Sequence, residues 1–104
     1  MDKRELVYAP RAQRDLLKLP KRFALQILED LELLKDPPWP AGKVKKLRGH
    51  DFYEIKTGDF RTLFWPHRQD VVILRVIARR DLQAAIGRID IQAVRKWLGE
   101  NREP

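Results

Sequence analysis

Three runs of strand composition follow one another in the middle of the chain, and the turns between them leave room only for hairpins. The runs cover residues 52–56, 60–65 and 71–77, and the turns read TGD and PHRQD. Strands joined by so few residues pair antiparallel, because a parallel pair needs a crossover of a dozen or more residues. The sequence therefore predicts an antiparallel meander.

The segment before the meander predicts a strand and two helices. Residues 5–9 form a short β-prone run that stops at Pro10. Residues 11–18 and 21–35 carry apolar side chains at helical spacing, and Pro20 separates them. A pair of amphipathic helices needs a sheet to cover its apolar stripe. We expect a two-helix hairpin packed on one face of the sheet.

The chain closes with a further helical segment, which completes the predicted fold. Ile91, Val94, Trp97 and Leu98 follow a helical period after an interruption at Gly87. We predict an α+β fold with the element order β-α-α-β-β-β, a mainly antiparallel four-stranded sheet and a C-terminal helical extension over residues 86–100. A length of 104 residues fits one domain, 1–104.

Positive charge is concentrated in one part of the chain. Residues 41–80 hold ten Lys and Arg against four Asp and Glu, so +6 of the net charge of +7 lies there. A clustered basic surface favours a polyanionic partner, since each cation that neutralises a phosphate releases a counterion. A solvated basic surface without a partner is the alternative. The clustering favours a nucleic acid or an acidic protein.

Several classes of site and location are disfavoured by composition. The chain has no cysteine and two histidines, which excludes disulfides and thiolate metal sites and makes a histidine metal site improbable. We expect no metal and no cofactor. No apolar run approaches the roughly 18 residues of a membrane span, and the first residues lack the apolar stretch of a signal peptide. We expect a cytoplasmic protein with no membrane partner.

Strand alternation sorts the side chains of the meander onto two faces. Glu54 and Lys56 share one face of the first run, while Tyr53 points the other way, toward the helices. In the second run Arg61 alternates with Thr62. Polar side chains thus recur on one face near the TGD turn. Trp39, in a proline-rich loop, is expected to pack back on the core.

Four strings of the sequence together resemble a known superfamily. They read VYAPRAQRDLLKLP, KLRG, YEIKTGDFRTLFW and VVILRVIARRD, and they cover about residues 5–82. In content and order they resemble the RelE/ParE superfamily of bacterial type II toxins, nearer its RelE branch. The resemblance implies a RelE-like fold with the helical hairpin on one face of the sheet and a basic cleft on the other.

The resemblance also implies an activity. RelE-type toxins are ribosome-dependent messenger-RNA endoribonucleases that inhibit translation, whereas ParE-type toxins share the fold and poison DNA gyrase. RNA cleavage needs neither metal nor cysteine, because the 2′-hydroxyl attacks the adjacent phosphate and the protein moves protons and stabilises charge. Fixed arginines suit charge stabilisation, since a guanidinium grips phosphate oxygens in a bidentate way.

Candidate catalytic residues follow position by position. Arg61 lies where the RelE branch has a phosphate-stabilising arginine, Arg80 where a second one follows the last strand, and Lys56 at one of two strand lysines. The position of the other strand lysine is occupied by Glu54, a candidate general base, although pairing with Lys56 is the simpler interpretation. A flanking set of cations is expected to bind ribosomal RNA and the message. That set is Lys43, Lys45, Lys46, Arg48 and Arg79.

One departure leaves the activity open. Many RelE-type toxins carry a tyrosine or histidine shortly after the second arginine, and residues 81–88 contain neither. Tyr53, His50 or His67 could replace it only where the fold brings one in. The alternatives to the ribonuclease are a ParE-like toxin that acts on gyrase and a decayed toxin that only binds its antitoxin.

The expected partners are a cognate antitoxin, RelB-like or another acidic amphipathic chain, and the ribosome with its messenger RNA. Operator DNA is expected only through the antitoxin complex. The C-terminal helix with Trp97 is expected to pack on the core. Competition between this helix and the antitoxin is a second hypothesis, because such antitoxins wrap a toxin with an amphipathic helix.

Overall fold

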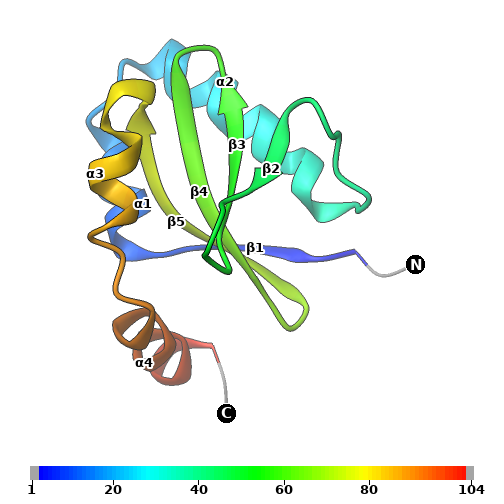
Figure 1. Cartoon of the computed structure of the whole chain (residues 1–104), viewed down its shortest axis with the longest axis vertical. Coiled ribbons are helices and arrows are strands. Elements are labelled where there is room, and N and C mark those ends of the chain that lie inside the picture. Colours follow the sequence, from blue (N-terminus) through cyan, green and yellow to red (C-terminus); the bar gives the residue numbers. More distant parts are fainter. Residues whose placement is uncertain (1–2, 103–104) are drawn as a thin grey trace.

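Five strands form one sheet in the computed structural model, which describes residues 3–102 (Figure 1). The strands are β1 (Glu5–Tyr8), β2 (Val44–Lys46), β3 (Tyr53–Thr57), β4 (Phe60–His67) and β5 (Asp70–Ala78). Their order across the sheet is β1-β5-β4-β3-β2, and β1 pairs parallel to β5 while every other pair is antiparallel.

The α+β class and the central meander are confirmed, and the predicted number of strands is wrong. The sheet has a fifth strand, β2, inside the basic run that precedes the meander. It is only three residues long, and two of them are exposed lysines. Short, charged strands are typical of sheet edges, where they discourage pairing with other chains. The composition of β2 is therefore like that of a charged loop, which is why the sequence did not predict a strand here.

Helices α1 (Pro10–Leu17) and α2 (Lys21–Leu31) form the predicted hairpin. Pro10 is the first residue of α1, a position that suits proline because the first-turn N–H has no helical partner. The second helix is shorter than predicted, since its last turn tightens into a 3₁₀ segment, η1 (Glu32–Lys35).

The hairpin packs on one face of the sheet and buries the larger apolar side chains there. Helical residues in this core are Ala12, Ile27, Leu31 and Leu34, and they meet Phe64, Ile55 and Ile73 of the strands. Trp39 packs back as expected. Its ring lies edge-on to Tyr53 and Phe64, and its indole N–H donates to the Leu34 carbonyl at 3.0 Å.

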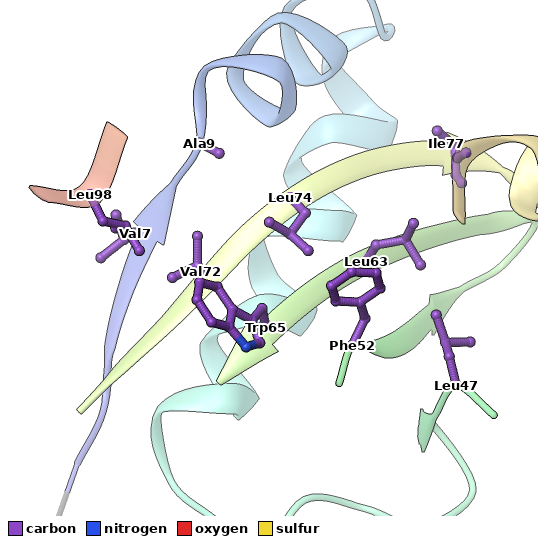
Figure 2. Close-up of a cluster of buried hydrophobic side chains, with 11 residues drawn as sticks. Val7, Ala9, Leu47, Phe52, Leu63, Trp65, Val72, Leu74, Ile77 and Leu98 are labelled. Carbon is purple, nitrogen blue, oxygen red and sulfur yellow. The ribbon is translucent and has the colours of Figure 1, made fainter. Parts of the chain in front are cut away.

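The opposite face of the sheet is covered at one end by the C-terminal segment. After the 3₁₀ turn η2 (Arg79–Asp81) come α3 (Leu82–Ile86) and α4 (Ile91–Asn101). Buried apolar side chains on this face form a second core. Figure 2 shows Leu98 of α4 near Val7 at one end of the second core and Leu47 at the other. The predicted packing of the C-terminal helix is confirmed, because Leu98 is 1% exposed.

At the sheet corner around the β3–β4 turn, η2 and the start of α3 border the sheet on the face opposite the hairpin. Figure 1 places that turn at the top of the view and α4 at the bottom. Within residues 3–102, no helix has the length and apolar character needed to cross a membrane.

Candidate active site

A hollow of about 270 Å³ lies at this corner of the sheet. It brings together all four predicted catalytic residues and two of the predicted RNA-binding cations. The lining residues are Lys45, Glu54, Lys56, Arg61, Arg79, Arg80, Leu82 and Gln83. We call it the basic hollow. Strand β2, hairpin β3–β4, turn η2 and helix α3 all contribute to it.

The β3–β4 turn holds these elements together. Thr57 pairs with Phe60, so the loop contains only Gly58 and Asp59. Gly58 has a φ of +55°, which a residue without a Cβ adopts at little cost. The Asp59 carbonyl accepts a hydrogen bond from the Arg79 backbone N–H at 2.8 Å. This bond fixes η2, and with it Arg79 and Arg80, beside the hairpin.

Glu54 and Arg61 form a buried ion pair at the base of the hollow. The Glu54 Oε1 and Arg61 Nε atoms are 3.6 Å apart, and the two side chains are 4% and 11% exposed. The pairing of Glu54 with Lys56 that the sequence favoured is wrong. Glu54 lies opposite Leu63, so Arg61 is its diagonal cross-strand neighbour on the same face. Lys56 remains exposed to solvent.

Arg61 also folds back on the turn. Its Nη1 donates to the carbonyl oxygens of Gly58 and Phe60, both at 2.9 Å. Part of its donor capacity is thus used inside the protein. Arg61 contacts both Glu54 and the backbone of the turn.

Four other cations around the hollow are presented to solvent. Lys45, Lys56, Arg79 and Arg80 are exposed, and within residues 3–102 none of these four side chains forms an ion pair. Because Arg61 offsets the charge of Glu54, the net field at the hollow is strongly positive. Such an arrangement attracts a phosphate and can stabilise charge that develops on it.

The remaining predicted RNA-binding residues lie elsewhere. Lys43 forms an ion pair with Asp30 of α2, with Nζ and Oδ2 3.0 Å apart, so it faces the helical side. Lys46 lines a neighbouring hollow, and Arg48 is exposed but lines neither hollow. Two lining residues, Leu82 and Gln83, were not predicted. The one signal in the sequence is their position, two and three residues after Arg80.

The structure separates the three residues that could replace the missing tyrosine or histidine. Tyr53 stacks on Phe64 in the helical core, with ring centroids 5.5 Å apart. His67 lies at the other end of β4 and stacks on Trp65. His50 is exposed and stacks on Phe52, which lies two residues before Glu54. None of the three lines the basic hollow.

Nothing in this site is arranged to hold a metal ion. Within residues 3–102, no three His, Asp or Glu side chains gather in a way that could bind one. The groups that are present, a carboxylate and several cations, can accept a proton and stabilise negative charge on a phosphate.

Solved structures with the same fold are toxins. The chain is 29% identical to a chain of the RelBE2 toxin–antitoxin complex from Mycobacterium tuberculosis, with a TM-score of 0.64, covering 74% of this chain and 99% of that one. It is 27% identical to a chain of the RelE–RelB complex from Pyrococcus horikoshii, with a TM-score of 0.63 and coverages of 76% and 97%. It is 25% identical to a free Escherichia coli RelE variant in which two arginines are replaced by alanine. The TM-score is 0.63, and the match covers 85% of this chain and 99% of that one.

The chain is thus similar in fold to RelE toxins. Residues 6–83, well over half of the sequence, match the family described as the ParE toxin of type II toxin–antitoxin systems. The chain therefore belongs to the ParE toxin family, within the RelE/ParE superfamily of type II toxins. No curated protein sequence matched it.

Proposed function

We propose that this toxin is a metal-independent endoribonuclease that cleaves messenger RNA on the ribosome. The observation that carries the proposal is the basic hollow, where four exposed cations surround a buried carboxylate. The carboxylate of Glu54 lines the hollow and is paired with Arg61. A site that cleaves RNA needs a proton acceptor as well as cations.

In this reaction the RNA supplies its own nucleophile. Glu54 takes the proton from the 2′-hydroxyl, the 2′-oxygen bonds to phosphorus, and the bond from phosphorus to the 5′-oxygen breaks. A proton from water is delivered to the leaving 5′-oxygen, and Glu54 gives its own proton back to solvent. The products are a 2′,3′-cyclic phosphate and a 5′-hydroxyl end. Lys56 and Arg80 stabilise the charge at phosphorus, while Arg61 positions Glu54. Lys45 and Arg79 in the hollow, with Lys46 and Arg48 elsewhere on the surface, hold the RNA backbone, which positions the message without reading its sequence.

The test is primer extension on reporter messages in translating cells or a reconstituted translation system. Wild type should cut within translated codons, and Arg80→Ala should lower the cleavage rate about 100- to 1,000-fold. Arg88→Ala is the matched control, because Arg88 is an exposed arginine outside the basic hollow. Equal cleavage by wild type and Arg80→Ala would contradict the assignment of Arg80 to charge stabilisation at phosphorus.

A second candidate is poisoning of DNA gyrase, which the match to the ParE family favours. ParE-type toxins share this fold, and the segment after Arg80 lacks the tyrosine or histidine of many RelE-type toxins. Growth arrest with intact messages, together with trapped cleavage complexes of purified gyrase and DNA, would support this candidate and overturn the ribonuclease.

We also propose a cognate antitoxin as partner. Two of the similar structures are toxin–antitoxin complexes, and an acidic amphipathic helix would complement the surplus of positive charge. Co-expression of the gene encoded beside this one, followed by copurification and relief of growth arrest, tests the proposal. A cytoplasmic location follows from a ribosomal target.

A further inference from the structure

A second hollow lies in front of the start of β3 and is separate from the basic hollow. It measures about 360 Å³ and is lined by Lys46, Gly49, His50, Asp51, Phe52 and Ile91. We call it the His50 hollow. Lys46 and Phe52 of this hollow are close in sequence to Lys45 and Glu54 of the basic hollow, and no residue lines both hollows.

The imidazole of His50 is a flat, rigidly held surface. Its ring is stacked on Phe52, with centroids 5.4 Å apart and an angle of 11° between the planes. Phe52 is 6% exposed and covers one face of the imidazole, whereas His50 itself is exposed. One face of the ring is therefore left for a further stacking partner.

The loop that carries His50 is fixed before any ligand binds. Leu47 N–H donates to the Phe52 carbonyl at 2.9 Å, and His50 N–H donates to the Leu47 carbonyl at 3.1 Å. Leu47 and Phe52 are both buried in the second core, and Gly49 makes the turn with a φ of +81°. A preformed stacking surface binds its partner without a large ordering cost.

We infer that the His50 hollow is a base-binding subsite, in which a nucleobase next to the cleaved phosphate stacks on His50. The inference rests on the proposed function for the phosphate site. Sequence-tolerant recognition of single-stranded RNA combines such stacking with cations that follow the backbone. Lys46 at the rim supplies the cation, and Ile91 of α4 supplies an apolar wall.

Asp51 gives the subsite a preference among bases. Its carboxylate is exposed at the rim of a basic surface and only accepts hydrogen bonds. A carboxylate accepts from an exocyclic amino group, such as the one on cytosine, and is repelled by a carbonyl oxygen. Cytosine and uracil have the same shape and differ at this group, so the subsite is expected to prefer cytosine.

The experiment measures binding of fluorescent 2′-O-methyl hexanucleotides, which cannot be cleaved because the 2′-oxygen is blocked. Homopolymers of cytidine, uridine and abasic ribose are compared at one ionic strength, because phosphate contacts depend on salt. Wild type should bind the cytidine strand most tightly and the abasic strand least. His50→Ala should weaken binding of both base-bearing strands about 5- to 100-fold and leave the abasic strand unchanged.

Three variants sharpen this experiment. His50→Trp should retain tight binding, because it keeps a stacking surface. Asp51→Asn should remove the preference for cytidine over uridine, because an amide can pair with either edge. His67→Ala is the matched control, since it removes a stacked imidazole that does not line the His50 hollow. Thermal unfolding of each variant excludes loss of fold as the cause.

The outcomes separate this inference from the proposed function. Base-dependent binding that is lost in His50→Ala, by a protein that cuts no message, supports the subsite and removes the ribonuclease. Cleavage of messages with wild-type binding by His50→Ala overturns the subsite and leaves the ribonuclease intact. Absence of binding to any of the strands also overturns the subsite.

Discussion

The Glu54 carboxylate and the Arg61 guanidinium form an ion pair across β3 and β4, 3.6 Å apart and almost fully buried. Removing one partner of a buried pair leaves an uncompensated charge, which typically costs about 3 to 5 kcal/mol. Arg61→Met should therefore lower the free energy of unfolding by about 3 kcal/mol. Urea denaturation followed by circular dichroism measures this loss.

A double variant provides the control for this prediction. Glu54→Leu together with Arg61→Met removes both charges, so it should recover much of the stability lost by Arg61→Met alone. Lys35→Ala breaks an exposed pair with Glu32 and should cost less than about 1 kcal/mol. If Arg61→Met unfolds at the wild-type urea concentration, the pair has no structural importance. Loss of toxicity in Arg61 variants must be compared with this loss of stability.

Two threonines on the sheet should respond in opposite ways to the same change. Thr62 is 1% exposed, and its hydroxyl has no hydrogen-bond partner within the described residues. Thr62→Val replaces an unsatisfied polar atom by a methyl group of similar size, so it should raise the free energy of unfolding by about 1 kcal/mol. Urea denaturation provides the measurement.

Thr57 is the matched control for that change. Its hydroxyl donates to Asp30 Oδ2 at 2.6 Å, and the residue is 8% exposed. Thr57→Val should lower the free energy of unfolding by about 2 kcal/mol, because a hydrogen bond to a carboxylate is lost. Equal effects of the two substitutions would mean that the hydroxyl contacts do not decide stability at these positions.

The sequence predicted the elements whose apolar side chains are regularly spaced or whose connecting turns are short. The meander, the helical hairpin and the C-terminal helix were expected because apolar spacing and short turns specify them locally. Strand β2 was missed, since the three residues Val44–Lys46 become a strand only through pairing with β3. The parallel pairing of β1 with β5 is likewise a contact between distant segments.

The sequence predicted which charged residues lie together at the candidate site, but not which of them contact one another. Alternation along β3 and β4 placed Glu54, Lys56 and Arg61 on one face, as the structure has them. Which cation pairs with Glu54 depends on the cross-strand register, which puts Arg61 on the diagonal. The stacking of His50 on Phe52 depends on a loop whose conformation is fixed by Leu47 and Phe52 in the core.

Asp15 connects helix α1 to Arg75 and Val76 of β5. Its Oδ2 accepts from Arg75 Nε at 2.7 Å and from the Val76 backbone N–H at 2.9 Å, and the carboxylate is 13% exposed. Asp15→Ala leaves both donors without a partner and should lower the free energy of unfolding by about 3 kcal/mol. Urea denaturation provides the measurement.

Asp15→Asn separates the two contacts. The amide oxygen can still accept from Val76, so this variant should lose about half as much stability as Asp15→Ala. Asp36→Ala is the matched control, because the Asp36 carboxylate is 65% exposed and 4.0 Å from Lys3 Nζ; its effect should be within about 0.5 kcal/mol. A loss of similar size at Asp36 would show that charge alone accounts for the effect at Asp15.

Tyr8 gives the fold a sensitivity to alkaline pH. Burial raises the pKa of Tyr8 above its ordinary value, and the nearby charge of Glu32 adds to the rise. Because the folded state holds the phenolic proton more tightly than the unfolded state, this contribution to stability is fully present below the unfolded pKa of about 10 and is lost as pH rises through the folded pKa.

Urea denaturation at a series of pH values should show wild type losing stability more steeply above about pH 10 than Tyr8→Phe. Glu32→Gln should reduce that difference only in part, since burial is the larger cause. Parallel pH curves for wild type and Tyr8→Phe would mean that the phenol titrates alike in the folded and unfolded states.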